Sequence, residues 1–254
     1  MVKNESNILM LKKLVKRFLP QSVLQFKNNI AIKDSSNVLI YIHIGKCGGA
    51  SLWEAINKSP ILKEKFMKIH KVHVEKPPVL KNARYIVVIR NPIKRAISAF
   101  NWRYRLVVEK QTKRHRNDDE YEVLKKYGTL NNLAEALYVD DALDENVSKD
   151  FQIIHHLKES ISFYLKDALD YIKAEQVFCV LSTETLNDDI YKNLAVIEVA
   201  RAHENAKNTG ESKKFLSDKA CENLRRYLCD DYQCIEKLLT LRNTTSCDPS
   251  LLLS

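Results

Sequence analysis

The sequence predicts an α/β protein with a mainly parallel sheet flanked by helices, and three observations support this. Apolar runs typical of buried strands alternate with amphipathic segments typical of helices, which is the order that parallel sheets require. Glycine and proline are few, 5 and 6 in 254 residues, which favours a helix-rich α/β chain over an all-β one. A hydrophobic content of 45% with 29% charged residues indicates a globular chain.

Two apolar runs predict the strands of the first half. Residues 38–44 (VLIYIHI) are almost continuously apolar, as strands buried on both faces are, and we expect a helix over 51–57 to follow. Residues 84–90 (RYIVVIR) predict a second strand of the same kind. It should end at Asn91, which can cap a helix, and at Pro92, which suits the first helical position. An amphipathic helix is expected to follow them.

The second half begins with a segment of different character. Residues 107–150 are dense in charges of both signs and weakly apolar, so we predict a helical insertion there. The regular pattern then returns with a helix near 151–172, a strand at 177–181, a helix opening near Thr183 and a last helix over about 217–241. We expect residues 31–254 to form a single domain, preceded by a separate N-terminal region of residues 1–30.

The N-terminal region contains a basic amphipathic segment, residues 8–19 (ILMLKKLVKRFL). Such a helix either lies on a membrane surface or packs against the domain, and the pattern leaves both alternatives open. The sequence has no uncharged stretch long enough for a membrane span and nothing that resembles a signal peptide. We therefore predict a cytoplasmic protein, with peripheral membrane contact through residues 8–19 as an alternative.

Cysteine spacing and net charge limit the metals and binding partners that the sequence allows. The six cysteines show no C-x-x-C spacing and no partnered histidines, so we expect no metal site. Reduced thiols are the simpler interpretation, although the four C-terminal cysteines could pair. The formal charge of +9 predicts an anionic partner. A nucleic acid, a phosphorylated nucleotide, an acidic glycan and an anionic membrane all meet that condition.

A glycine-rich turn after the first predicted strand indicates a phosphate site. Residues 45–49 (GKCGG) hold three of the five glycines and stand where a strand should pass into a helix. Unpaired N–H groups, the helix dipole and close approach at glycine together attract a phosphate group. Lys46 adds a full charge and Ser51 a hydroxyl. The turn is not a Walker A loop, because Ile40 stands where the first glycine of that motif belongs and Cys47 follows the lysine.

The loop resembles the 5′-phosphosulfate-binding loop of sulfotransferases that use 3′-phosphoadenosine 5′-phosphosulfate (PAPS). The best match is the carbohydrate-modifying branch, similar to the heparan-sulfate 2-O-sulfotransferase type and its bacterial relatives, whose loop reads roughly H-I-P-K-T-G-G-T-S. This sequence has Gly for Pro, and Cys and Ala for the two Thr. The resemblance implies a P-loop-like sheet, PAPS as co-substrate and no metal. It assigns the phosphosulfate to Lys46, Cys47, Gly48, Gly49, Ala50 and Ser51.

A second motif strengthens the resemblance, which covers roughly residues 38–240. Residues 90–100 (RNPIKRAISAF) are similar to the family's R-D-P-x-x-R-x-x-S-x-F, in which the first arginine and the serine bind the nucleotide 3′-phosphate. The resemblance implies these roles for Arg90, a charged bidentate fork, and Ser98. Ser98 can reach the same anion only if its helix lines the cleft. A weaker match near the C-terminus implies phosphate contacts by Lys213 and Lys214.

The implied reaction transfers the sulfuryl group to an acceptor hydroxyl by in-line displacement. Lys46 suits stabilisation of the leaving oxygen, and a histidine suits removal of the hydroxyl proton. In the heparan-sulfate branch a His-x-His-Val element between the two phosphate motifs carries the base. His73 matches its end and the other histidine is displaced to His70. We predict His73 as the catalytic base and His70 as the alternative, because an offset of three sends two rings of an extended segment to opposite faces. Two surface histidines without a role are the remaining alternative.

The expected acceptor is a carbohydrate or glycolipid, an acidic glycan among the candidates, in the biosynthesis of a sulfated surface polysaccharide or glycolipid. Trp53 and Trp102 lie beside the two motifs and either stack on adenine or a sugar, or pack in the core. Basic residues around the insertion either hold an acidic glycan or form a solvated face. They are Arg103, Arg105, Lys110, Lys113, Arg114 and Arg116.

Two other classes of function remain as alternatives. An ATP-dependent small-molecule kinase would need Mg²⁺ and an acidic ligand after a strand, and the sequence offers no convincing one. A non-catalytic binder of an anionic polymer would need a concentrated basic surface. Here the basic residues are scattered among acids with little aromatic interleaving, so we expect no nucleic-acid partner.

Overall fold

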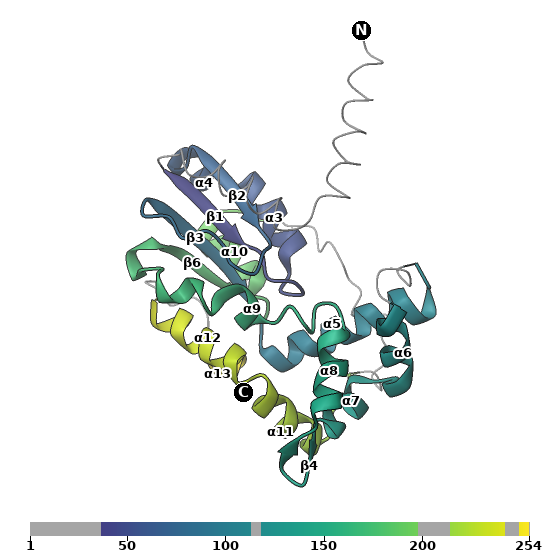
Figure 1. Cartoon of the computed structure of the whole chain (residues 1–254). Coiled ribbons are helices and arrows are strands. Elements are labelled where there is room, and N and C mark those ends of the chain that lie inside the picture. The colour runs from purple at the N-terminus through teal and green to yellow at the C-terminus, as the bar shows by residue number, and fades with distance from the viewer. Residues whose placement is uncertain (1–36, 113–117, 198–213, 242–248, 254) are drawn as a thin grey trace.

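The computed structural model describes residues 37–112, 118–197, 214–241 and 249–253 (Figure 1). Its main sheet has four parallel strands in the order β2-β1-β3-β6. They are β1 (Val38–Ile42), β2 (Lys68–Val72), β3 (Ala83–Ile89) and β6 (Val177–Ser182). The predicted α/β class, a parallel sheet flanked by helices, is confirmed. The amphipathic segment 8–19 and the whole region 1–30 lie outside the described residues.

Helices cover both faces of the sheet. On one face lie α3 (Gly49–Lys58), α4 (Pro60–Lys65) and α10 (Leu186–Leu194), and α10 contacts the other two. On the other face, α12 (Cys229–Leu241) contacts α9 (Ile161–Leu165) and strand β6 (Figure 1). Because the sheet is covered twice, its central strands are apolar on both faces, and every residue of β1 is buried.

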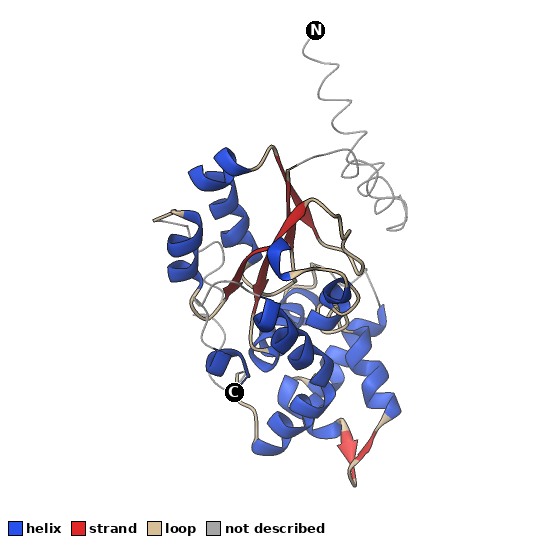
Figure 2. Ribbon diagram, turned by 90° about the vertical axis from the view of Figure 1, so that its left-hand side faces the viewer, coloured by secondary structure: helices blue, strands red, loops and turns tan. Residues whose placement is uncertain are grey.

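The remaining helices build a second apolar cluster beside the sheet. Helix α5 (Pro92–Tyr104) runs into a π-helical turn, Arg105–Glu109. The described residues between 107 and 150 are mainly helical, as predicted, and include a small hairpin that projects at the far end of the molecule (Figure 2). The elements are α6 (Asp118–Tyr127), α7 (Leu130–Ala136), β4 (Tyr138–Val139), β5 (Ala142–Leu143) and α8 (Glu145–Ile153). From the C-terminal part of the chain, α11 (Asp218–Tyr227) packs on α7. Short turns of helix complete the fold: Ala168–Asp170, Ala174–Gln176 and α13 (Pro249–Leu253).

The start of α5 follows the predicted capping pattern. The Asn91 side chain accepts a hydrogen bond from the Lys94 N–H at 3.0 Å, and Pro92 occupies the first turn. Farther along, Arg103 donates to both carboxylate oxygens of Glu120 on α6, at 2.7 and 2.6 Å, and both side chains are buried. The expectation that Arg103 faces a glycan or solvent is therefore wrong, because this face of α5 is covered by α6.

Three elements differ from the sequence prediction. Strand β2 was not expected as an element of the sheet, because its residues (KIHKV) alternate weakly, and at the sheet edge only Val72 is buried. The helix expected near 151–172 is interrupted at His156, whose φ is 70°, and the chain restarts as α9 with Ser160 as its cap. The last helix is divided into α11 and α12 at Leu228.

The described ranges also bear on membrane crossing and cysteine pairing. None of their helices is long and apolar enough to cross a bilayer. Cys47, Cys179, Cys221, Cys229 and Cys234 are all free thiols, and Cys247 lies outside the described residues.

Candidate functional site

The two sequence motifs meet at the carboxyl edge of the sheet. From β1 the chain moves outward to β2 on one side, and β3 lies on the other side of β1. In open parallel sheets ligands bind at such a switch point, beyond the carboxyl ends of the strands. Lys46 follows β1 and Arg90 follows β3. Arg90 Nη1 donates to the main-chain carbonyl of Lys46 at 3.3 Å, so the two residues predicted to bind phosphate lie together.

The glycine-rich loop has the backbone that the sequence predicted for an anion site. Gly48 adopts φ 71° as the N-cap of α3, and no side chain caps this helix start. Lys46 also has a left-handed backbone, φ 69°, which is costly for a residue with a side chain. At Gly49 an added Cβ would lie 1.8 Å from the His43 ring, so only glycine fits. The N–H groups of the first helical turn thus border the loop without an acidic side chain nearby in sequence.

Several positive groups converge on this loop, and Lys46 and Arg90 have no ion-pair partner within the described residues. Burial, together with the nearby charges of Arg90, Arg105 and Arg95, lowers the pKa of Lys46 to about 8. The Nε atoms of Arg90 and Arg105 are buried and have no hydrogen-bond partner. Such groups are satisfied by an anionic ligand rich in hydrogen-bond acceptors.

One face of α5 lines the same loop. Arg95 Nε donates to the Gly45 carbonyl at 3.0 Å, and the Lys46 ammonium lies 4.6 Å from the centre of the Trp102 ring. Residues spaced by three and four share a helix face, so Ser98 lies between Arg95 and Trp102 on the side that faces the loop. The predicted role of Ser98 requires its helix to border the site, and α5 does so through Arg95 and Trp102.

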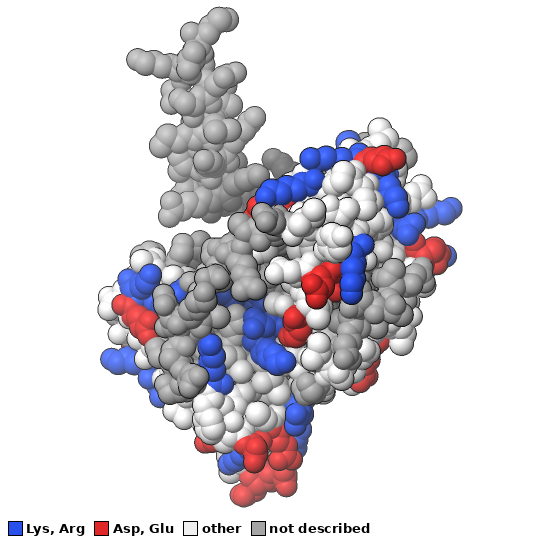
Figure 3. Space-filling model, turned by 180° about the vertical axis from the view of Figure 1, so that it is seen from behind, with Lys and Arg blue, Asp and Glu red and all other residues white. Residues whose placement is uncertain are grey.

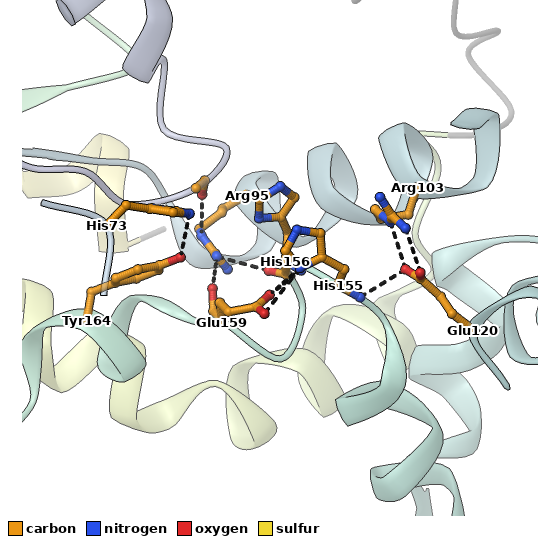
Figure 4. Close-up of polar contacts among 9 residues, drawn as sticks. His73, Arg95, Arg103, Glu120, His155, His156, Glu159 and Tyr164 are labelled. Carbon is orange, nitrogen blue, oxygen red and sulfur yellow. Dashed lines mark hydrogen bonds and ion pairs between the residues drawn. The ribbon is translucent and has the colours of Figure 1, made fainter. Parts of the chain in front are cut away.

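Arg95 also brings a distant segment to the loop. This side chain is only 2% exposed. Its Nη2 donates to the main-chain carbonyl of His156 at 2.9 Å and to that of Glu159 (Figure 4). Charged hydrogen bonds of this kind are among the stronger polar contacts in proteins. Arg95 is therefore a structural anchor between the glycine-rich loop and residues 156–159.

The hydrogen bonds of His73 define its ring nitrogens. Nδ1 lies 2.6 Å from the His43 main-chain carbonyl, which can only accept, so Nδ1 carries the hydrogen and Nε2 keeps its lone pair. Partial burial lowers the pKa of His73, and this effect, with smaller contributions from the charges of Lys71 and His155, outweighs the opposing effects of the His43 hydrogen bond and Glu159. The side chain is nevertheless exposed. His73 is therefore an accessible neutral imidazole with a free basic nitrogen.

His70 lies in a different environment from His73. It pairs with Ile40 in the register of β1 and β2, whereas Lys71 pairs with Tyr41, so His70 points to the opposite face from Lys71. The His73 ring instead packs beside the His43 ring, with centroids 4.8 Å apart. Burial lowers the pKa of His70, and its buried Nε2 has no partner. The structure thus brings His73, and not His70, to the glycine-rich loop.

A loop between α8 and α9 supplies residues that the sequence did not indicate. His155 Nδ1 lies 3.1 Å from Glu159 Oε1, and the His156 N–H donates to Glu159 Oε2 at 2.6 Å. Burial acts to raise the pKa of Glu159, but the hydrogen bond and charge of His155 and the contacts of His156 lower it to about 2. Burial, together with His155, Lys46 and Arg95, lowers the pKa of His156 to about 2. Glu159 is therefore anionic and His156 neutral at neutral pH.

The same three side chains have the composition of a metal site. Their candidate ligand atoms lie within 4.8 Å of one another. The cluster lies beside Arg95, whose Nη2 donates to the main-chain carbonyls of His156 and Glu159 (Figure 4).

The other residues predicted to contact the nucleotide differ in what they can offer. Cys47 is fully buried and burial raises the pKa of its thiol to about 11, so only its backbone can meet a ligand. Ala50 is exposed at the helix start, and Ser51 is half-buried. Lys214 is exposed, whereas Lys213 lies outside the described residues, as do Lys113, Arg114 and Arg116.

The turn after β6 closes the edge of the site. Glu184 accepts hydrogen bonds from the Asn91 N–H at 3.2 Å and from Ser182 Oγ at 2.7 Å.

Trp53 is half-buried and stacks on Tyr41, with ring centroids 6.3 Å apart. Two surface hollows, one beside Asp119 and one beside Val79, lie away from the glycine-rich loop. The site is thus recognised by its charges and hydrogen-bonding groups.

Comparison with known proteins adds no relative to this description. No protein-family model matches the chain, and no curated protein matches it significantly.

Proposed function

We propose that the protein is a PAPS-dependent sulfotransferase that transfers the sulfuryl group to a hydroxyl of a carbohydrate or glycoconjugate. The observation that carries this proposal is the meeting of Lys46 and Arg90 at the carboxyl ends of neighbouring strands, without a carboxylate partner among the described residues. Two anion-binding groups on adjacent loops suit a small molecule with phosphate at both ends. The order of the motifs resembles that of the family, which supports a P-loop-like interpretation of the sheet.

The residues present fit such a nucleotide. The start of α3 and Lys46 would hold the 5′-phosphosulfate, and Arg90 with Ser98 would hold the 3′-phosphate. The unpartnered buried Nε of Arg90 supports this assignment, because a phosphate oxygen would satisfy it. PAPS supplies a sulfuryl group attached to a good leaving group, 3′,5′-adenosine bisphosphate.

His73 and Lys46 divide the work of the reaction. Nε2 of His73 takes the proton of the acceptor hydroxyl while that oxygen forms a bond to sulfur. The bond between sulfur and the phosphate oxygen breaks, and its electron pair remains on the phosphate. Lys46 stabilises the charge that develops on this oxygen. The lowered pKa of His73 supports the role of base, because the neutral ring is present at neutral pH.

Two observations weigh against the alternative functions. Glu184, the carboxylate that follows β6, is committed to Asn91 and Ser182, whereas a kinase would need it for Mg²⁺. On the face seen in Figure 3, Lys and Arg side chains are interspersed with Asp and Glu, which disfavours a charge-driven polymer binder. The acceptor class belongs to the proposal through the family resemblance, the cytoplasmic location through the sequence features already described, and membrane contact through the amphipathic pattern of residues 8–19.

Thermal unfolding with ligands tests the proposed function. We expect 3′,5′-adenosine bisphosphate to raise the midpoint without added metal, since a ligand at about 100 times its Kd adds roughly 2.7 kcal/mol of stability. ATP with Mg²⁺ should give no comparable shift. Stabilisation by ATP with Mg²⁺ and none by the bisphosphate would favour the kinase instead.

Bisphosphate affinity should depend on pH through Lys46. The free site holds this ammonium with a pKa of about 8, and a bound phosphate raises the pKa by favouring the charged form. Above pH 8, binding of the bisphosphate therefore requires Lys46 to take up a proton. The affinity for the bisphosphate should be steady up to pH 8 and fall as the pH rises further. Calorimetric titration with the bisphosphate across this pH range measures the decline. Lys46→Arg should flatten the decline, because guanidinium keeps its charge.

A further inference from the structure

We infer that Tyr164 is a positioning residue that holds the base, His73, over the glycine-rich loop with Nε2 as its basic nitrogen. The Tyr164 hydroxyl lies 3.4 Å from His73 Nε2, and the two rings stack with centroids 5.1 Å apart (Figure 4). Tyr164 is on α9, 91 residues away in sequence from His73. The inference rests on the proposed function for its catalytic meaning, but the contact itself can be measured without turnover.

The positions of the hydrogens follow from the partners. His73 Nδ1 donates to the His43 carbonyl, so the lone pair is on Nε2 and the Tyr164 hydroxyl must be the donor between the two. The hydroxyl oxygen also faces the N–H of Gly45 in the loop. The Tyr164 hydroxyl therefore lies between the main chain of the loop and the base.

Tyr164 is itself held firmly. Its side chain is 1% exposed, and burial raises the pKa of its hydroxyl, so it remains a donor. The helix start is fixed by two caps: Ser160 accepts from the Phe163 N–H, and Asp231 of α12 accepts from the N–H groups of Ile161 and Ser162. The Tyr164 side chain is therefore fixed in position, and its hydroxyl orients the His73 ring.

This contact has a consequence for the acceptor. In the ligand-free site the Tyr164 hydroxyl occupies the hydrogen-bonding position at Nε2 that an acceptor hydroxyl must take. The long distance of 3.4 Å makes the bond weak and readily replaced. Tyr164 thereby selects the tautomer and the ring orientation before the acceptor arrives.

The contact also predicts a change in the pKa of His73. The Tyr164 donor stabilises the neutral ring, because protonation of Nε2 would leave a buried hydroxyl hydrogen without its acceptor. The other charged or titratable groups that act on the ring are Lys71 on β2, His43 after β1, and Glu159 with His155 on the loop before α9. Tyr164→Phe leaves all of these in place, so any change reports the hydroxyl.

Titration of His73 by NMR is the direct test, with its resonance assigned by comparison with a His73→Gln variant. In Tyr164→Phe the pKa of His73 should rise relative to the wild-type chain. Tyr85→Phe is the matched control, because Tyr85 is also buried and its hydroxyl bonds Leu80 and Pro78 at the opposite end of the sheet. That variant should lose stability without moving the His73 titration. An unchanged or lowered pKa in Tyr164→Phe overturns the inference.

Kinetics provide the second measurement. Tyr164→Phe should lower kcat/KM for the acceptor by about two- to tenfold, the effect of one neutral hydrogen bond, and move the acidic limb of the kcat/KM profile, which reports the free enzyme, upward. The Kd of 3′,5′-adenosine bisphosphate should stay unchanged. A variant with a wild-type kcat/KM and pH profile contradicts the positioning role. If the wild-type chain transfers no sulfuryl group, the proposed function is contradicted. The NMR titration still decides whether the Tyr164 hydroxyl affects the pKa of His73.

Discussion

His73→Ala is expected to reduce kcat for sulfuryl transfer by about 10²- to 10⁴-fold, the range that removal of a general base produces. The reason is the geometry of the ring: Nδ1 is fixed by the His43 carbonyl, and Nε2 is the basic nitrogen beside the glycine-rich loop. His73 forms no contact with Arg90 or Ser98 in the structure, so bisphosphate affinity should remain near that of the wild-type chain. Steady-state kinetics and calorimetry measure the two quantities separately.

The same assay on His70→Ala decides between the two histidines. His70 lies on the opposite face of β2 from Lys71 and away from the glycine-rich loop, so its loss should affect turnover far less than the loss of His73. If His73→Ala keeps turnover and His70→Ala loses it, the base has been assigned to the wrong residue. If both keep it, the base lies outside this segment.

Lys46→Ala should weaken binding of 3′,5′-adenosine bisphosphate by roughly 10- to 150-fold, which corresponds to the loss of about 1.5–3 kcal/mol for a hydrogen bond to a charged group. Lys46 is half-buried among Arg90, Arg95 and Arg105 and forms no ion pair within the described residues, so its charge is available to a ligand. Calorimetric titration measures the effect.

Lys58→Ala is the matched control for this variant. Lys58 is on the same helix, α3, but at its carboxyl end, where it pairs with Glu54 at 2.7 Å on the surface. Exposed pairs of this kind contribute little, so both stability and bisphosphate affinity should stay close to wild type. Normal affinity in Lys46→Ala would remove the glycine-rich loop from the binding site.

The sheet could be predicted to the extent that its strands are buried on both faces. The runs at 38–44, 84–90 and 177–181 are mainly apolar, and the structure has strands that overlap each of them. Edge strand β2 has no such signal, because one side of its residues faces solvent. Helix interruptions at His156 and Leu228 were also missed, since they depend on tertiary contacts and not on glycine or proline.

The site was predictable where local sequence carries the chemistry. The glycine-rich turn and the strand-ending arginine are each visible as motifs, and parallel strands place their ends at one edge. Glu159 and Tyr164 carry no motif, and they reach the site only because Arg95 and Asp231 fasten the loop and α9 in place. Arg103 was assigned to the surface because its buried partner, Glu120, is 17 residues away in an irregularly patterned segment.

The most direct measurement is a crystal structure of the protein with 3′,5′-adenosine bisphosphate. We predict that one bound molecule spans both motifs, with its 5′-phosphate at the start of α3 beside Lys46 and its 3′-phosphate on Arg90 and Ser98. A nucleotide bound elsewhere, or one that leaves either Lys46 or Arg90 without a phosphate, would contradict the account.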